Sequence, residues 1–482
     1  MVGTNLRIWP SSHGGRRIGV CVAHFYPVAI TSGAVSSDDV VAARKLLRDV
    51  ISETPVVHSR VLSEAIGGPV YLKCENLQRT GSFKVRGAYV RIARLSDAER
   101  ARGVVAASAG NHAQGVAFAA GLLGCEATVV MPEGAPLPKV EATRGYGAHV
   151  VLTGTCVEDC LSEALAYADR AGAIFIHPYD HADVVAGQGT LGFEVVEQCP
   201  QVRTVVVPVG GGGLAAGVAV AVKDLDPAIN VVGVQAEAVA PYPGSLAAGH
   251  PMSVKAEPTM ADGIAVSRPG EIPFAILSEL AERVVTVSEE SLSRGLLLCL
   301  ERAKQVVEPA GAAGVAALLE HSRDFIPPVV VLLSGGNIDP LLLSKLLRHG
   351  LTAAGRYLAF RCRLPDHPGS LAKLLGDLAD LGANVLEVGH ERLGPRLHVD
   401  EAEVVLVVET RGPAHCEEVI GALRSAGYTL AFSLSLPAAV LLKSSASYVG
   451  RSRRVPCAVA RSAKIRLDAT DNSYLFYDCP LL

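Results

Sequence analysis

The sequence lacks a strong excess of charge of either sign. Its 44 Lys and Arg residues and 48 Asp and Glu residues leave a formal net charge of -4 over 482 residues. A chain this close to neutral sets up no field that would attract nucleic acid or an anionic membrane surface. We therefore expect small-molecule partners, with no nucleic acid and no membrane among them.

Paired cysteines are also missing. The 11 cysteines are an odd number and form no CxxC motif, and the closest two, Cys156 and Cys160, would lie one helical turn apart. Thiols in this pattern are typical of a reducing compartment. We expect a cytoplasmic protein in which Cys156 and Cys160 are helix-packing thiols and not a redox pair.

An uninterrupted apolar run that could cross a bilayer is absent as well. Residues 204–222 carry no charge and have sufficient length, but Pro208 and four consecutive glycines interrupt them. Such a break is typical of a strand, a loop and a helix in succession, and not of a membrane-spanning helix.

What the sequence does contain is a regular alternation of short apolar runs and helices between residues 36 and 350. The chain is too long for one hydrophobic core, and its 49% of hydrophobic residues predicts two or three packed domains and not disorder. The expected strands are residues 69–75, 104–109, 127–132, 148–153, 173–178, 204–209, 230–235 and 329–334. Nearly continuous apolar strands joined by helices predict an α/β fold with a parallel sheet buried on both faces. Ligands of such sheets bind beyond the carboxyl ends of the strands.

The motif GSFKVRGA, residues 81–88, contains the side chain on which the functional prediction depends. Lys84 stands between Phe83 and a turn of small residues, and Arg79 and Arg86 are close in sequence. A lysine amine attacks a carbonyl only when burial or nearby cations lower its pKa. Lysines beside arginines are more often solvated surface charges, so this interpretation needs support from other turns.

Three further turns follow expected strands and carry unusual residues. In residues 109–117, AGNHAQGVA, small residues and Asn111 open a helix whose free N–H groups suit a carboxylate. In residues 210–217, GGGGLAAG, four glycines can turn successive N–H groups toward one phosphate, although the GK[ST] ending of a P-loop is absent. SGGN offers the Ser334 hydroxyl at a strand end. Together with the lysine, these turns indicate a phosphorylated carbonyl cofactor, and pyridoxal 5'-phosphate fits best.

The motifs GSFKVRGA, SAGNHAQGVA, PVGGGGLAAG, EPAGAAG and SGGN, in this order, resemble the threonine/serine dehydratase (threonine ammonia-lyase) family of fold-type II pyridoxal-phosphate enzymes. The resemblance covers about residues 37–345 and implies a catalytic domain, placed at residues 36–350, with a parallel sheet like that of tryptophan synthase β. It implies a cofactor site formed by Phe83, Lys84, Asn111, Gly210, Gly211, Gly212, Gly213, Leu214 and Ser334. It also implies a substrate site formed by Ser82, Ser108, Ala109, Gly110, Asn111 and His112, with Glu308 close by.

The resemblance also implies a role for several of these residues. Lys84 matches the catalytic lysine that binds the cofactor through its amine and takes the substrate's α-proton. Asn111 matches the residue at the cofactor's ring hydroxyl, and Ser334 the residue facing the pyridine nitrogen. A neutral serine at that nitrogen stabilises a carbanion less than a carboxylate would, which favours β-elimination of the hydroxyl over transamination. The expected reaction converts L-threonine to 2-oxobutyrate and ammonia, with L-serine to pyruvate as a secondary activity.

Three other functions remain open. A serine racemase shares the proton abstraction but needs an acid on the opposite ring face; racemases of this family have a serine where this chain has Ala109, which carries no such proton. A sulfur-transferring β-replacement enzyme would require an activated O-acyl or O-phospho substrate. A catalytically decayed amino-acid-binding sensor would fail to load the cofactor.

No metal site is expected. Gln235 and Pro241 stand where the two acidic metal ligands of related racemases would align. His177 and His181 have a ligand spacing compatible with a helix, but Pro178 breaks that helix and no third ligand is evident.

Beyond residue 350 the pattern changes to alternating strands and amphipathic helices in the order βαββαβ. With DHPGSL at the first strand-to-helix turn, residues 356–436 resemble an ACT regulatory domain. That resemblance implies an amino-acid effector site at Asp366 and Gly369 between paired domains, and a homodimer or homotetramer is expected. Allosteric feedback would suit an enzyme that opens isoleucine biosynthesis. The alternative is a dimerisation module that binds no ligand.

The two ends of the chain fit neither pattern. Residues 1–35 show no sustained periodicity or motif and are left as an unassigned N-terminal extension. Residues 437–482 are left as an unassigned basic tail containing Arg451, Arg453, Arg454, Arg461, Lys464 and Arg466. We expect an unstructured extension there, and a nucleic-acid-binding tail is the alternative.

Overall fold

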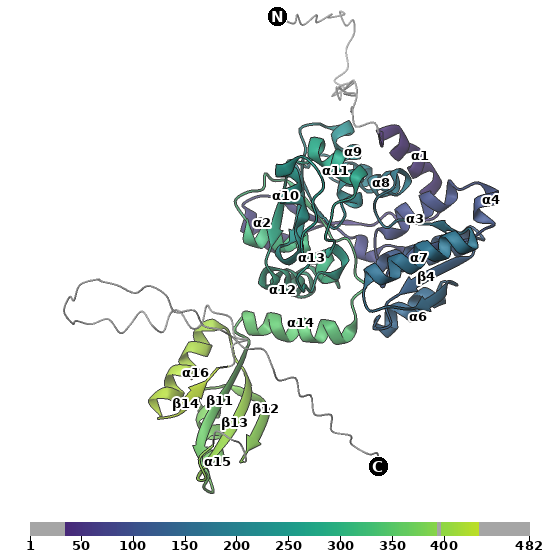
Figure 1. Ribbon diagram of the computed structural model, residues 1–482. Helices are drawn as coiled ribbons and strands as arrows, with labels where there is room; N and C mark the ends of the chain where they lie inside the picture. Colours follow the sequence, from purple (N-terminus) through teal and green to yellow (C-terminus); the bar gives the residue numbers. More distant parts are fainter. Residues whose placement is uncertain (1–33, 393–396, 433–482) are drawn as a thin grey trace, which may run out of the picture. The chain divides into compact units, whose positions relative to one another are not determined.

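The computed structural model describes residues 34–392 and 397–432 (Figure 1). The predicted tail at residues 437–482 and nearly all of the predicted extension at residues 1–35 lie outside this part. The strands expected between residues 36 and 350 form two sheets. The apolar pattern predicted these strands, but it did not indicate which strands belong to which sheet.

The larger sheet has six strands in the order β1-β2-β10-β7-β8-β9. They are β1 (Val56–His58), β2 (Val70–Lys73), β7 (Thr204–Pro208), β8 (Asn230–Ala236), β9 (Arg283–Val287) and β10 (Val329–Leu332). β1 is antiparallel to β2, and the other pairs are parallel. Along β7, Val205 and Val207 pack into one apolar core and Val206 into another. The sheet is therefore buried on both faces, as predicted.

Helices cover both faces of the six-stranded sheet. The Val205 face packs against α1 (Ser37–Leu47), α8 (Ala182–Gln198), α9 (Gly213–Leu225) and α11 (Glu271–Leu280). The Val206 face packs against α2 (Arg60–Ile66), α12 (Glu289–Leu298), α13 (Pro309–Glu320) and α14 (Pro340–Ala353). Connecting segments include α10 (Pro241–Ala248), the short turns η1 (Glu75–Leu77), η2 (Arg79–Gly81), η3 (Glu237–Val239) and η4 (Asp262–Ile264), and the π-helical turn η5 (Cys299–Ala303).

The smaller sheet is wholly parallel and has the order β5-β4-β3-β6. Its strands are β3 (Val104–Ala107), β4 (Ala127–Met131), β5 (His149–Leu152) and β6 (Ile174–Phe175). α3 (Lys84–Ala93), α5 (Asn111–Leu122) and α6 (Leu137–Gly145) pack on one face and α7 (Val157–Ala171) on the other, and α4 (Asp97–Arg100) is a single turn. Figure 1 shows α6 and α7 on either side of β4.

The two cysteines of α7 differ in their environment. Cys160 is buried in the core beneath α7, whereas Cys156 is exposed at the N-terminal cap of the helix, and both thiols are free. The prediction of packing thiols is therefore confirmed for Cys160 and wrong for Cys156, because the helix begins after Cys156.

Two strands of the larger sheet were not predicted. β1 has three residues, and β9 begins at Arg283 with most of its residues half-buried. Both strands are at the edges of the sheet. Edge strands have one neighbour and partial exposure, so their sequences carry a weaker apolar pattern than central strands do.

The C-terminal segment forms its own antiparallel sheet in the order β12-β13-β11-β14. Its elements are β11 (Tyr357–Pro365), α15 (Ser370–Asp380), β12 (Asn384–Glu391), β13 (Glu401–Glu409), α16 (Pro413–Ser425) and β14 (Thr429–Ala431). Val404, Leu406 and Val408 alternate with half-buried residues along β13 and are fully buried. The predicted βαββαβ order is confirmed.

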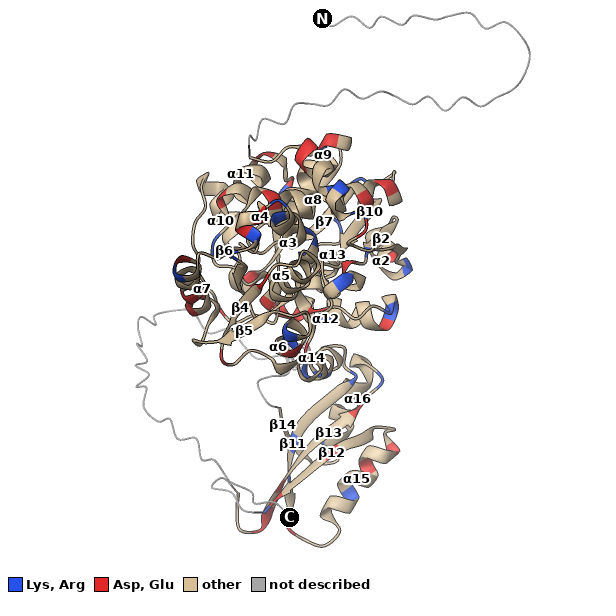
Figure 2. Cartoon of the chain, turned by 90° about the vertical axis from the view of Figure 1, so that its right-hand side faces the viewer, with Lys and Arg blue, Asp and Glu red and all other residues tan. Residues whose placement is uncertain are grey.

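Positively and negatively charged residues are intermixed over the described chain, in keeping with its small net charge. Figure 2 shows Lys and Arg interspersed with Asp and Glu along the helices. Within the described ranges, every helix is too short or too polar to cross a bilayer.

Candidate active site

The turns that follow β3, β6, β7 and β10 surround a cavity of about 440 Å³. This volume is within the usual range for a small-molecule site. The predicted residues that line it are Phe83, Lys84, Ser108, Ala109, Gly110, Asn111, His112, Gly210, Gly211, Gly212, Gly213, Leu214 and Ser334. Ser82 is not among the lining residues; it is fully buried, and its hydroxyl has no hydrogen-bond partner among the described residues.

Lys84 is the first residue of α3, and its amine faces the cavity. The Nζ atom donates a hydrogen bond of 3.0 Å to the carbonyl of Pro178 and lies 5.3 Å from the centre of the Phe83 ring. Burial lowers the pKa of the Lys84 amine to about 8, and the nearby Glu308 carboxyl opposes the shift. Part of the Lys84 population is therefore neutral, and nucleophilic, near physiological pH.

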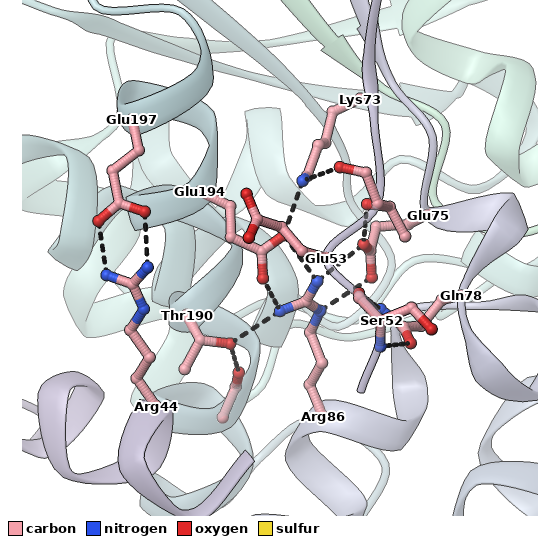
Figure 3. A network of polar contacts seen from close by, with 12 residues as sticks. Arg44, Ser52, Glu53, Lys73, Glu75, Gln78, Arg86, Thr190, Glu194 and Glu197 are labelled. Atoms are coloured by element: carbon pink, nitrogen blue, oxygen red, sulfur yellow. Dashed lines mark hydrogen bonds and ion pairs between the residues drawn. The ribbon is translucent and has the colours of Figure 1, made fainter. Parts of the chain in front are cut away.

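Arg86 does not contribute to this pKa shift, contrary to the suggestion of the sequence. Its buried guanidinium pairs with Glu75 at 2.8 Å and with Glu194 at 2.6 Å, and Lys73 pairs with Glu194 at 2.6 Å. Figure 3 shows these side chains in one network. Because Lys73 belongs to β2 and Glu194 to α8, the network ties α3 to both elements. The role of Arg86 is to anchor the helix that begins with Lys84.

The four glycines form a tight loop between β7 and α9. Gly212 caps α9 with a φ of +102°, in the left-handed region that favours glycine. A Cβ atom on Gly211 would overlap the Tyr179 ring, and one on Gly212 would overlap the Tyr242 hydroxyl. Side chains are thus excluded at the N-terminus of α9, where free N–H groups and the helix dipole favour a phosphate.

Asn111 is held by hydrogen bonds to two side chains. Its Nδ2 donates to Glu308 Oε1 at 2.7 Å, and Asn337 Nδ2 donates to Asn111 Oδ1 at 2.8 Å. Burial raises the pKa of the Glu308 carboxyl to about 7, with a further contribution from Asp262. The end of β10 and the start of α13 therefore orient the first residue of α5.

Two histidines beside the cavity are neutral. His112 Nε2 lies 2.8 Å from the carbonyl of Ile176, and burial lowers the pKa of His112 to about 3. His177 Nδ1 accepts N–H bonds from Tyr179 and Asp180, and burial lowers its pKa to about 4. Sequence analysis considered His177 only as a metal ligand; its position directly after β6 was the signal that it faces the site.

The family described as pyridoxal-phosphate-dependent enzyme matches residues 47–335. The chain belongs to this family. The match extends from the end of α1 to the SGGN turn and so includes every residue of the cavity described above.

Named members of the pyridoxal-phosphate family resemble the chain over most of their length. It is 46% identical over 394 residues to L-threonine ammonia-lyase of Thermotoga maritima, which covers 82% of this chain and 98% of the relative. It is 44% identical over 315 residues to catabolic L-threonine dehydratase TdcB of Escherichia coli K12, covering 65% of this chain and 96% of the relative.

Solved structures extend the resemblance to the fold. The processed form of threonine deaminase isoform 2 from Solanum lycopersicum superposes with a TM-score of 0.62 at 37% identity, covering 64% of this chain and 91% of that one. Maize serine racemase superposes with a TM-score of 0.62 at 32% identity, covering 66% of this chain and 98% of that one. The α/β fold of the pyridoxal-phosphate family is thus confirmed, and it is shared by dehydratases and racemases.

The residues in the cavity fit pyridoxal 5'-phosphate. The amine of Lys84 is buried enough to be partly neutral, as the cofactor's aldehyde requires. The glycine loop leaves no room for side chains where a phosphate would bind. The chain therefore depends on pyridoxal phosphate, and Lys84 and the loop from Gly210 to Leu214 are the groups that would hold it.

The residues considered as metal ligands have other partners. Gln235 donates to the Val209 carbonyl and accepts the N–H of Tyr242, and His181 Nδ1 accepts the N–H of Asp183 at the start of α8. Within the described ranges, no three His, Cys, Asp or Glu residues group as a metal site would require.

Proposed function

We propose that the protein is a pyridoxal-phosphate-dependent L-threonine ammonia-lyase that also dehydrates L-serine. The observation that carries this proposal is the Lys84 amine, with a pKa of about 8, in a cavity bordered by the glycine loop. The identity of 46% to the Thermotoga maritima L-threonine ammonia-lyase over 82% of the chain supports threonine as the substrate.

The residues of the cavity have distinct parts in this reaction. When bound, the cofactor supplies an aldehyde for the substrate amine and a ring that accepts electrons from the α-carbon. Asn111 would hold the ring hydroxyl and Ser334 the ring nitrogen, while the loop from Gly210 to Leu214 would hold the phosphate. The predicted substrate contacts of the loop from Ser108 to His112 remain part of this proposal, whereas Ser82 is fully buried and is not among the residues lining the cavity.

Lys84 is the general base in the proposed reaction. Its neutral amine takes the α-proton of threonine, and the β-hydroxyl leaves as water once it has gained a proton. The enamine that remains tautomerises and is hydrolysed to 2-oxobutyrate and ammonia. The deprotonated fraction of Lys84 near neutral pH follows from its lowered pKa.

A turnover assay tests the proposal. The purified holoenzyme should convert L-threonine to 2-oxobutyrate, and Lys84→Ala should lose at least about a thousandfold in rate, because no other residue replaces both its functions. Borohydride reduction should trap the cofactor on Lys84, as shown by peptide mass mapping. Trapping on another residue, or full activity of the alanine variant, would refute the assignment.

Serine racemase is the second candidate, because the maize enzyme has the same fold. Ala109 lines the cavity but carries no proton for the opposite face of the substrate. We therefore expect pyruvate to form much faster than D-serine from L-serine. Faster D-serine formation would favour the racemase, and Ala109→Ser should raise the racemase share.

We further propose that residues 36–350 are the catalytic domain and residues 356–436 an ACT-like regulatory domain that binds an amino-acid effector. Gly369 caps α15 with a φ of +93°, and nothing lies within 4 Å of where its Cβ would be. Asp366, at the same turn, pairs with Arg392 at 3.3 Å. An open turn with a carboxylate beside it suits an α-amino acid, whose amine Asp366 would bind.

The effector proposal predicts that a branched-chain amino acid changes threonine turnover. Gly369→Val should weaken this response at least about tenfold, since a β-branched residue is strained at positive φ and fills the open turn. Gly376→Val is the matched control, because Gly376 lies on α15 with the same open space but no positive φ. An equal response in both variants would contradict the proposed site. Sedimentation of the full chain would test the proposed dimer or tetramer.

A further inference from the structure

The cavity wall carries one cation, besides Lys84, that is well shielded from solvent. The charged residues that line the cavity are Lys84, Lys139, Glu158, Asp262, Arg268 and Glu308. Arg268 pairs with Glu271 at 2.6 Å and has a side chain 47% exposed, so its charge is largely solvated. The Lys139 side chain is only 13% exposed.

Lys139 lies beside the loop predicted to bind the substrate carboxylate. It belongs to the first turn of α6, and its Nζ is 3.9 Å from the position that a Cβ on Gly110 would occupy. The same amine influences Glu308, since it lowers the pKa of that carboxyl against the effect of burial. Lys139 therefore lines the cavity close to both Gly110 and Glu308.

The loop itself offers only neutral donors to a carboxylate. Within the loop, the N–H of Gly110 donates to the Ser108 hydroxyl at 3.2 Å. The remaining donors are the Ser108 hydroxyl, the N–H groups at the start of α5 and the Asn111 amide, which already donates to Glu308. These groups can hold a carboxylate, and a cation that pairs with the same carboxylate would bind it more strongly through a charge-assisted hydrogen bond.

Lys139 has a partner that it can release at little cost. Its Nζ bonds Asp262 Oδ2 at 3.0 Å, and the Asp262 side chain is 57% exposed. Because water can hydrate a carboxylate this exposed, the Lys139–Asp262 pair contributes little stability and is replaceable. Asp262 lies on η4, against α13, so the pair crosses from the smaller sheet's helices to the larger sheet's side of the cavity.

We propose that Lys139 binds the α-carboxylate of the substrate, which displaces Asp262 from the amine. The inference rests on the proposed function only in that the cavity receives an amino acid. It makes Lys139 a substrate-binding residue and Asp262 its competitor. If the ion pair served only to link the two sides of the cavity, which we call a static tie, replacing either residue would change substrate binding in the same direction.

The proposed role predicts that replacing Lys139 and replacing Asp262 change the affinity for L-threonine in different ways, whereas a static tie predicts the same change. Lys139→Met removes the cation and should weaken the binding of L-threonine about ten- to a hundredfold, the range of a hydrogen bond to a charged group. Asp262→Asn removes the competing anion and should leave the binding of L-threonine unchanged or make it tighter. If both variants weaken binding by similar factors, the pair is a static tie and the proposal is wrong.

A titration with two ligands isolates the carboxylate. Holoenzyme is titrated with L-threonine and with L-threoninamide, which lacks the carboxylate, and binding is followed by the absorbance of the cofactor. Lys139→Met should lose affinity for L-threonine and keep its affinity for L-threoninamide within about threefold, while Lys139→Arg should retain most of the preference for the acid. An equal loss for both ligands overturns the proposal.

Lys255→Met is the matched control. Lys255 pairs with Glu257 at 2.8 Å in the same way, but its side chain is 86% exposed, and it is not among the residues lining the cavity. This variant should bind both ligands as the unmodified protein does. If L-threonine binds but is not turned over, the proposed function fails, yet the titration still decides the role of Lys139.

Discussion

At the scale of the residue, the reactivity of Lys84 depends on where its amine lies and not on its neighbours in sequence. Arg86 is two residues away and takes no part, because its guanidinium is satisfied by Glu75 and Glu194. Burial lowers the pKa of Lys84, and Glu308, far along the chain, partly restores it. The protein thereby sets the fraction of neutral amine available to the cofactor.

This pKa can be measured through cofactor uptake. The rate at which the apoenzyme takes up pyridoxal phosphate should rise with pH through a midpoint near 8, because only the neutral amine is nucleophilic. Glu308→Gln should move the midpoint to lower pH, since the charge that favours the lysine cation is removed. The check is a series of stopped-flow absorbance traces. A midpoint near the ordinary lysine value of 10.5 would contradict the buried amine.

At the scale of the element, α3 is held in place by buried ion pairs. Arg86 on α3, Glu75 after β2 and Glu194 on α8 are almost completely buried, and Lys73 completes the network from β2 (Figure 3). Thr54 Oγ1 also donates to Glu75 at 2.6 Å. Helix α3 carries Lys84 as its first residue, so the position of the amine depends on this network.

Removing Arg86 should therefore be much more costly than removing an exposed arginine. Arg86→Met leaves Glu75 buried without its paired cation and leaves Glu194 paired with Lys73 alone, and it should lower the free energy of unfolding by about 3 to 5 kcal/mol. Arg44→Met breaks a two-bond pair with Glu197 whose side chains are 44% and 49% exposed, and should cost about 0 to 1 kcal/mol. Urea denaturation of both variants gives the comparison. Equal losses would show that the network adds no more than a surface pair.

At the scale of the whole molecule, the described strands before Gly355 form two sheets, and those from Tyr357 onward form a third, antiparallel sheet. The parallel sheets of residues 34–353 bury their own cores, and the antiparallel sheet from Tyr357 has another, including Leu358, Phe360 and Leu406. We propose on this basis that the two parts are separate domains.

A chain that ends at Gly355 tests this separation. We expect threonine turnover to remain within roughly threefold of the full chain, because every cavity residue precedes Gly355. The response to a branched-chain amino acid should disappear. Initial rates with and without the amino acid provide the measurement. A truncated chain that still responds would place the effector site in the catalytic part.

Local patterns predicted the central elements and most of the candidate site. The strands at residues 204–209 and 329–334 and the glycine loop were identified because their signals are confined to a few adjacent residues. β9 was missed because its edge position gives Arg283 and its neighbours only partial burial. Lys139 was missed because nothing near it in sequence marks a lysine that faces a cavity.

Short stretches of the amino-acid sequence were enough to predict the α/β class, the order of the C-terminal elements, and the lysine and glycine motifs of a pyridoxal-phosphate enzyme. The folded chain was needed to show that the strands before Gly355 form two sheets, that Pro178 and Glu308 lie near the Lys84 amine, and that Arg86 is an anchor. Secondary structure and turns depend on residues within a few positions of each other. Burial and charge at a site depend on side chains that the fold brings together from distant positions, so they are not visible before the chain is folded.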